Sequence, residues 1–81
     1  MQDHTIFERI NALSVEEEQL WQAAGDGDGL ATADRARLET IRVALDQCYD
    51  LLRQRDARRA AGMDPDEAKV RPAKVVEGYE Q

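Results

Sequence analysis

Four arginines lie close together in the second half of the chain and are its best candidates for binding chemistry. They are Arg53, Arg55, Arg58 and Arg59. A guanidinium group is a rigid fork of hydrogen-bond donors that matches the geometry of carboxylate and phosphate groups. The cluster therefore suggests a site for an anionic ligand, RNA or an acidic partner. The structural alternative is a solvated helix end, where positive charges complement the helix dipole.

The net charge of the chain opposes the RNA interpretation. Lys and Arg number 11 while Asp and Glu number 17, which gives a formal net charge of −6. Proteins that bind the phosphate backbone generically carry an excess of positive charge, because they neutralise phosphates with Lys and Arg. A nucleic acid partner is therefore not expected, although a local positive patch keeps that hypothesis open.

Metal and thiol chemistry lack the residues that they need. His4 is the only histidine, and no second histidine or cysteine stands at metal-ligand spacing from it. Asp26 and Asp28 resemble part of a calcium-binding loop, but Arg35 occupies the position of the bidentate acid. Cys48, the only cysteine, excludes an internal disulfide, and its place in an apolar stripe predicts a small buried hydrophobe. We expect no metal site and no cofactor.

The chain also lacks the signatures of an enzyme. A single histidine near the N-terminus gives no sign of a base placed beside a nucleophile. No phosphate-binding loop and no dinucleotide-binding motif is present in the sequence. Two packed helices offer little concavity for a substrate pocket. The sequence therefore predicts a non-enzymatic protein without catalytic residues.

The first element that must position these residues is a long helix over about residues 4–24, with Asp3 as its N-cap. Its apolar residues follow steps of three and four, as on one face of a helix. They are Ile6, Ile10, Leu13, Leu20 and Ala24. A capping-box pattern over residues 14–17 leaves a break near Leu13 as the alternative. Three glycines within residues 25–29 then predict a turn over about residues 25–31.

A second and longer helix is expected over about residues 33–61. Thr32 is a suitable N-cap and Gly62 a suitable residue after the helix end, and residues 33–61 contain neither glycine nor proline. Its apolar side chains spread over roughly 160° of the helix circumference, which is more than one narrow partner can bury. If the first helix folds back antiparallel, it covers one flank and leaves the other uncovered.

Six residues form the apolar face of the second helix that we assign to self-association. They are Ile41, Ala44, Leu45, Cys48, Leu51 and Leu52. A homodimer that packs through coiled-coil contacts into a four-helix bundle is the simplest way to bury this face. The alternative is that the C-terminal tail of the same chain packs over it.

The tail, residues 63–81, contains two sequences that can start short helices. Asp64 followed by Pro65 is one start, with proline at the first helical position, and Arg71 followed by Pro72 is the other. A short apolar edge follows, made by Val75, Val76 and Tyr79. Either this tail folds over the end of the second helix near residues 55–61, or it stays free in solution.

These elements make an all-α fold, an antiparallel two-helix hairpin with a short helical or extended tail, in a single domain over residues 1–81. The sequence begins without a basic stretch followed by an apolar one, so no targeting segment is expected. No apolar run approaches the roughly 20 residues that span a bilayer. The sequence therefore predicts a cytoplasmic protein with no membrane partner.

Several blocks of the sequence form a combination that is more specific than composition alone. They are residues 11–13, 27–30, 45–55, 64–68, 70–72 and 75–79. With these blocks, the chain resembles a small actinobacterial family, domain of unknown function 2630, over nearly its whole length. The resemblance implies that the tail belongs to the domain. It implies no activity, no cofactor and no site residues.

Two functional hypotheses follow. The leading one is a small non-enzymatic interaction or structural module that acts through helix–helix self-association, with a homodimer favoured, or through an unidentified protein partner. The alternative is a small regulator that binds an anionic ligand or RNA through the four arginines of residues 53–59.

Overall fold

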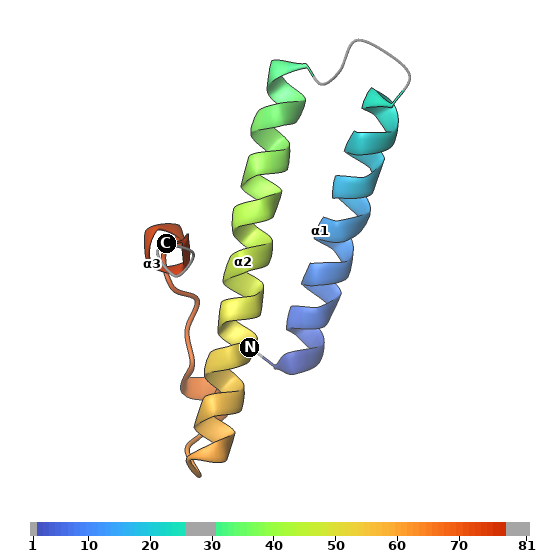
Figure 1. The fold of residues 1–81 in the computed structure, drawn as a ribbon. Helices are drawn as coiled ribbons and strands as arrows, with labels where there is room; N and C mark the ends of the chain where they lie inside the picture. The colour runs from blue at the N-terminus through green and yellow to red at the C-terminus, as the bar shows by residue number, and fades with distance from the viewer. Residues whose placement is uncertain (1, 26–30, 78–81) are drawn as a thin grey trace.

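The computed structural model describes residues 2–25 and 31–77, and its regular elements are helices (Figure 1). Helix α1 spans Asp3–Ala24, helix α2 spans Thr32–Ala60, and the tail carries a 3-10 turn, η1 (Pro65–Glu67), and a short helix α3 (Ala73–Glu77). The all-α class and the two long helices are thereby confirmed, with ends within one residue of those expected. Most of the predicted turn, residues 26–30, and the apolar residue Tyr79 lie outside the described residues.

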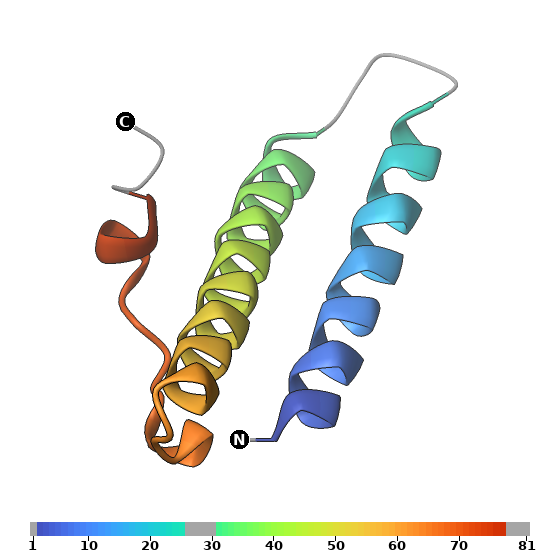
Figure 2. The same ribbon diagram turned by 60° about the horizontal axis from the view of Figure 1, so that its bottom comes forward.

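Helices α1 and α2 lie side by side and run antiparallel (Figures 1 and 2). The start of α1 pairs with the end of α2 through Asp3 and Arg55, and the second half of α1 pairs with the start of α2 through Glu16 and Arg37. Helix α1 continues without interruption through Leu13, so the alternative break at that position is wrong. The apolar seam of α1 therefore stays continuous along α2.

The starts of both helices differ from the prediction. Gln2 rather than Asp3 is the N-cap of α1, and Ala31 rather than Thr32 is the N-cap of α2. Neither N-cap makes a side-chain capping bond. The carboxylate of Asp3 instead accepts hydrogen bonds from two arginines of α2. In these pairs both the donor and the acceptor are charged, whereas in a capping bond only the carboxylate is charged, which favours the pairing with the arginines.

Helix α2 ends at the glycine predicted for it. Gly62 has a φ of +75°, in the left-handed region that glycine adopts without strain. The Gly62 N–H donates to the Arg59 carbonyl at 3.1 Å and the Met63 N–H donates to the Arg58 carbonyl at 2.7 Å. This pair of bonds is a Schellman motif. It reverses the chain direction and sends the tail back along α2.

A small aliphatic core lies where α1, α2 and the tail meet. Its buried members are Ile6, Ile10, Cys48, Leu51 and Ala68, and three leucines pack half-buried against them. Because Ala68 belongs to the tail, the tail closes this core on the second flank of α2. Tail packing is the alternative that the sequence left open beside self-association, and the homodimer stays a prediction.

The molecule is flat and one layer thick. In both ribbon views α2 lies between α1 on one side and the tail on the other (Figures 1 and 2). The backbone extends 52 × 27 × 15 Å, and its radius of gyration is 15.2 Å. A compact domain of this length has a radius of gyration near 12 Å. Both broad faces of the layer are therefore open unless something outside the described residues covers them.

Candidate functional site

The predicted arginine cluster contains one buried member, Arg55, which joins three parts of the chain. Arg55 lies near the end of α2 and is only 4% exposed. Its guanidinium group donates to the Asp3 carboxylate at the start of α1, to the Pro65 carbonyl at 3.1 Å and to Asp66 Oδ1 at 2.9 Å. Arg55 therefore fixes the start of α1 and η1 to α2.

Two further arginines of the cluster also pair with carboxylates of the same chain. Arg59 donates to Asp3 Oδ2 at 2.6 Å and to Asp56 Oδ1 at 2.7 Å, while Arg58 Nη1 lies 3.5 Å from Glu67 Oε2. The Arg59 and Arg55 guanidinium groups together hold the pKa of Asp3 below its ordinary value. The chain therefore supplies the anions that this cluster binds, and an external anion at Arg55 would have to displace Asp3.

The fourth arginine does not join this junction. Arg53 is exposed, and two residues along a helix turn a side chain roughly 200° away from that of Arg55. Of the four predicted site residues, the structure thus brings together Arg55, Arg58 and Arg59, and it places Arg53 elsewhere. The structural alternative, a solvated arginine near a helix end, fits the exposed Arg53 but does not fit Arg55, which is buried.

A second polar site, which the sequence reasoning missed, clamps the tail onto the middle of α2. Its centre is Asp50, which is 1% exposed and pairs in a bidentate manner with Arg71 of the tail, with Arg71 Nε 2.9 Å from Asp50 Oδ2. Gln54 Nε2 donates to Asp50 Oδ2 and to the Lys69 carbonyl, both at 2.9 Å. Gln47 Nε2 donates to the Arg71 carbonyl at 3.1 Å. We call Gln47, Asp50, Gln54 and Arg71 the tail clamp.

The tail clamp had a signal in the sequence. Gln47, Asp50 and Gln54 are spaced by three and four, so they form a polar stripe beside the broad apolar face of α2. From the sequence alone, such a polar stripe is interpreted as a solvated surface, because the tail residues that contact it are not known. The bidentate Arg71 pair is the main cause that lowers the pKa of Asp50, and the bond from Gln54 adds to it. Asp50 is therefore held as a carboxylate although it is buried.

The six residues predicted as a self-association face lie inside the single chain. Ile41, Cys48 and Leu51 are buried, and Ala44, Leu45 and Leu52 are half-buried. Helix α1 covers one flank of this set and the tail covers the other. The set therefore does not form one open face that a second copy could cover.

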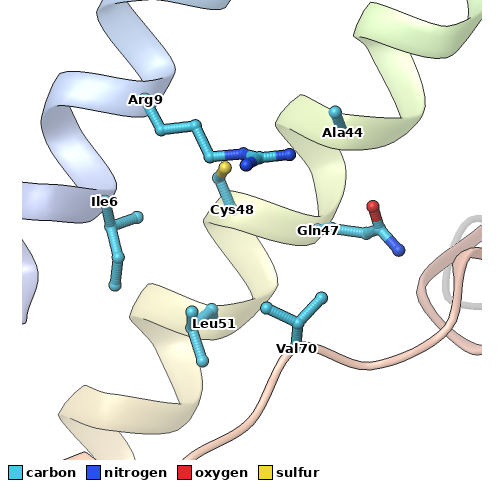
Figure 3. A pocket seen from close by; sticks show the side chains of 7 residues that line it. All are labelled: Ile6, Arg9, Ala44, Gln47, Cys48, Leu51 and Val70. Atoms are coloured by element: carbon cyan, nitrogen blue, oxygen red, sulfur yellow. The ribbon is translucent and has the colours of Figure 1, made fainter. Parts of the chain in front are cut away.

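A small cavity opens beside Cys48, where α1, α2 and the tail meet (Figure 3). Its volume is about 100 Å³, and its lining residues are Ile6, Arg9, Ala44, Gln47, Cys48, Leu51 and Val70. Binding pockets for small molecules usually reach about 300–1,000 Å³, so this cavity is too small for one. Burial raises the pKa of the Cys48 thiol, and the Arg9 guanidinium beside the sulfur offsets this only in part. Cys48 is therefore a packed thiol, as predicted.

A second and more open hollow lies between α1 and the first half of α2. It has a volume of about 290 Å³, and Glu17, Trp21, Arg35, Leu38, Glu39 and Arg42 line it. Trp21 is 56% exposed at its rim. The other aromatic residues among those described behave alike, because Phe7 is 53% and Tyr49 is 45% exposed. The part of the chain that the structure describes thus keeps aromatic rings out of its core.

Neither of two other classes of site is found in the described ranges. Residues 2–25 and 31–77 contain no cluster of three or more His, Cys, Asp or Glu side chains that could hold a metal ion. Within the same ranges, no helix combines the length and the apolar character needed to cross a membrane.

Comparisons with known proteins place these features in a family. A family model described as "Protein of unknown function (DUF2630)" matches residues 2–81. Uncharacterized proteins of Mycobacterium tuberculosis H37Rv and of Mycobacterium bovis are each 44% identical over 77 residues, which cover 95% of this chain and 88% of theirs. No solved structure significantly matches the chain. The resemblance found in the sequence is confirmed, and the matched region includes the tail clamp and the exposed aromatic residues.

Proposed function

We propose, from the premise that this chain belongs to the DUF2630 family, that it is a small non-enzymatic interaction module that binds protein surfaces. One observation carries this proposal: Phe7, Trp21 and Tyr49 are each about half exposed, while the buried core consists of aliphatic side chains, an alanine and a cysteine. Burial of an aromatic side chain contributes more favourable free energy than burial of a smaller side chain, because its apolar surface is larger. Aromatic residues are accordingly enriched at protein–protein interfaces.

The three aromatic residues lie on the same side of the hairpin. Phe7 and Trp21 are two heptads apart on α1, so they share one side of that helix with a drift of roughly 40°. Tyr49 is one heptad after Arg42 and two after Arg35, and both arginines line the hollow at Trp21. Tyr49 therefore lies on the side of α2 that faces this hollow. We call the surface that contains Phe7, Trp21 and Tyr49 the aromatic face.

The tail does not cover the aromatic face. The cavity that the tail helps to line contains Ala44, Cys48 and Leu51 of α2, whose wheel positions centre roughly 180° from those of Arg35 and Arg42. The tail and the aromatic face therefore lie on different sides of α2, and the tail leaves the aromatic face open. Domains generally consist of at least two packed layers around a core, and this chain supplies one. A partner surface on the aromatic face would complete the second layer.

Site-specific photo-cross-linking tests this proposal in cells. The photoreactive residue p-benzoylphenylalanine replaces Trp21 in one variant and Val15 in the matched control. Both positions are on α1 and similarly exposed, at 56% and 53%, but their wheel positions differ by roughly 120°. We expect protein adducts of Trp21→p-benzoylphenylalanine and none of the control. Equal labelling from both positions, or adducts from neither, would contradict a protein-binding aromatic face.

The alternative function, binding of an anionic ligand or RNA through Arg53, Arg55, Arg58 and Arg59, has less support. Three of these side chains already pair with carboxylates of the chain. Fluorescence anisotropy at two salt concentrations can measure RNA binding by the wild type and by a variant with alanine at these four positions. RNA binding that depends on the four arginines would support this alternative function. The non-enzymatic character, the absence of a cofactor and the cytoplasmic location stay predictions.

A further inference from the structure

We infer that the partner on the aromatic face is a second copy of this chain, with the two α2 helices antiparallel and crossing at Tyr49. This inference rests on the proposed function, because it names the occupant of the same surface. It moves the contact from the six-residue apolar face that the sequence suggested to the neighbouring side of α2, and Leu45 and Leu52 lie at the edge of both surfaces. The argument depends on charge order along α2 and on the residues that flank Tyr49.

A stripe of alternating charge runs along the exposed side of α2 through Tyr49. Its members are spaced by four and three residues and carry positive, negative, aromatic, positive and negative groups in that order: Arg42, Asp46, Tyr49, Arg53 and Asp56. All of them are exposed except Asp46, which is half-buried. Within one chain Arg42 pairs with Asp46 at 3.1 Å and Asp56 pairs with Arg59 at 2.7 Å, so a second copy would extend these ion pairs into a network across the interface. Residues at these spacings share one side of a helix, so the stripe can meet another helix along its length.

This charge order is complementary to itself when it is reversed. In an antiparallel pair with a two-fold axis at Tyr49, Asp46 faces Arg53 of the partner subunit, and Arg42 faces Asp56 of the partner subunit. The symmetry makes each of these pairs occur twice. In a parallel pair of α2 helices, every charge faces its own copy, which is repulsive. The two Tyr49 rings meet at the axis of the antiparallel pair.

The surroundings of Tyr49 favour a buried contact. Leu45 and Leu52 stand four residues before it and three residues after it, and both are only half-buried in the single chain. A second copy would cover the remaining parts of these side chains together with the tyrosine rings. The 52 × 27 Å outline of the molecule is wide enough for the roughly 800 Å² that each partner contributes to a standard interface.

Photochemical coupling of tyrosines tests the crossing point in the otherwise unmodified chain. Light-driven oxidation joins two tyrosine rings covalently when they lie against one another. The chain has two tyrosines, so Tyr79→Phe leaves only Tyr49 and Tyr49→Phe leaves only Tyr79. We expect a covalent dimer with dityrosine fluorescence from Tyr79→Phe, and its loss in Tyr49→Phe, which keeps the aromatic ring and is the matched control. Coupling that survives in Tyr49→Phe, or that is absent from both, overturns the crossing at Tyr49.

A charge exchange tests the antiparallel arrangement. Light scattering over a dilution series measures the dimer dissociation constant of the wild type, of Arg53→Asp, and of the double variant Asp46→Arg with Arg53→Asp. The single change replaces two attractive contacts by repulsive ones and should weaken the dimer about tenfold, whereas the double change exchanges the partners and should restore most of the affinity. Circular dichroism confirms that all three chains keep their helices.

The outcomes separate this inference from the proposed function. A wild-type chain that is monomeric throughout the micromolar range overturns the second copy as occupant. If Trp21→p-benzoylphenylalanine still cross-links to a different protein in that case, the aromatic face remains a binding surface and only the dimer is wrong. A dimer whose affinity the double exchange fails to restore overturns the antiparallel arrangement.

Discussion

At the scale of single residues, two buried charges define how this chain holds together. Asp50 and Arg55 are 1% and 4% exposed, and each has several partners of opposite charge or hydrogen-bonding capacity. A buried charge is costly unless it is paired and hydrogen-bonded. Among the described side chains, no buried nitrogen or oxygen lacks a partner. The free-energy cost of burying these two charges is therefore offset, but only while α1 and the tail stay packed on α2.

The pairing of Asp50 gives the protein a defined acid sensitivity. Because Arg71 lowers the pKa of Asp50 in the folded state, the unfolded chain binds more protons than the folded one in acid. The contribution of this pair to stability is complete above the ordinary aspartate range and is lost as the pH falls below about 4. We expect urea unfolding at pH 3–7 to show this fall, and Asp50→Asn to show a shallower one. The matched control Glu8→Gln, at an exposed acidic residue of α1, should keep the wild-type profile. An equally shallow profile there would contradict the assignment.

At the scale of elements, the tail shows what local sequence could and could not predict. Both expected helix starts exist, because the Asp64 side chain accepts from the Asp66 N–H at 2.9 Å, and α3 begins after Pro72. The sequence left open whether the tail folds over the end of α2 or stays free, and in the structure η1 lies at that end. It did not predict that the tail continues along α2 as far as Gln47, because the bonds that hold it there join residues 15–24 positions apart.

The arginine cluster illustrates the same limit. Its composition suggested a site for an external anion, whereas the acids that pair with Arg55 in the structure come from the start of α1 and from η1. Asp3 lies 52 positions before Arg55, so no local pattern connects them. A carboxylate near a helix start suggests an N-cap, and only tertiary packing shows that it pairs elsewhere. Helices could thus be predicted from periodicity, whereas the carboxylate partners of this arginine cluster could not.

The tail should protect Cys48 from reagents in solution. Ala68, which belongs to the tail, is 7% exposed and packs in the core that contains Cys48. An aspartate at position 68 would place an unpaired charge there and should release the tail. We expect alkylation of Cys48 by iodoacetamide, followed by mass spectrometry, to be at least about tenfold faster in Ala68→Asp than in the wild type. Lys69→Asp changes an exposed neighbour and is the control. Equal rates in all three chains would mean that the tail does not shield the thiol.

At the scale of the whole molecule, the distribution of apolar side chains separates two tasks. The buried core holds aliphatic side chains, an alanine and a cysteine, while each described aromatic side chain is about half exposed, as are Val15, Met63, Val70 and Val75. Fold stability therefore depends on the aliphatic set, and under the proposed function recognition depends on the aromatic set. Sequence periodicity identified the helices that carry both sets. Periodicity could not show that the aromatic residues are exposed. In the sequence pattern Phe7 and Trp21 lie at the edges of the apolar stripe of α1, and only the packing shows which side of that stripe is covered.

This separation predicts that two substitutions to serine, one buried and one exposed, change the free energy of unfolding by different amounts. Ile41 is 0% exposed, so Ile41→Ser should lower the free energy of unfolding by about 3 kcal/mol or more through a cavity and a buried hydroxyl. Trp21→Ser removes a side chain that is more than half exposed and should lower the free energy of unfolding of the single chain by only about 1–2 kcal/mol, although tryptophan is larger than isoleucine. Urea unfolding at a concentration low enough to exclude association measures both. A loss at Trp21 comparable to that at Ile41 would show that the tryptophan supports the fold.

The tail clamp has a consequence for the order in which the protein is made. Arg71 follows Asp50 by 21 positions, so a growing polypeptide contains the carboxylate before it contains the guanidinium that neutralises it. At roughly 5–20 residues per second, this interval lasts about one to four seconds. Until the tail packs on α2, Asp50 is a carboxylate without its guanidinium partner and must keep its contact with water. The closing of the tail over α2 is therefore the step that buries this charge.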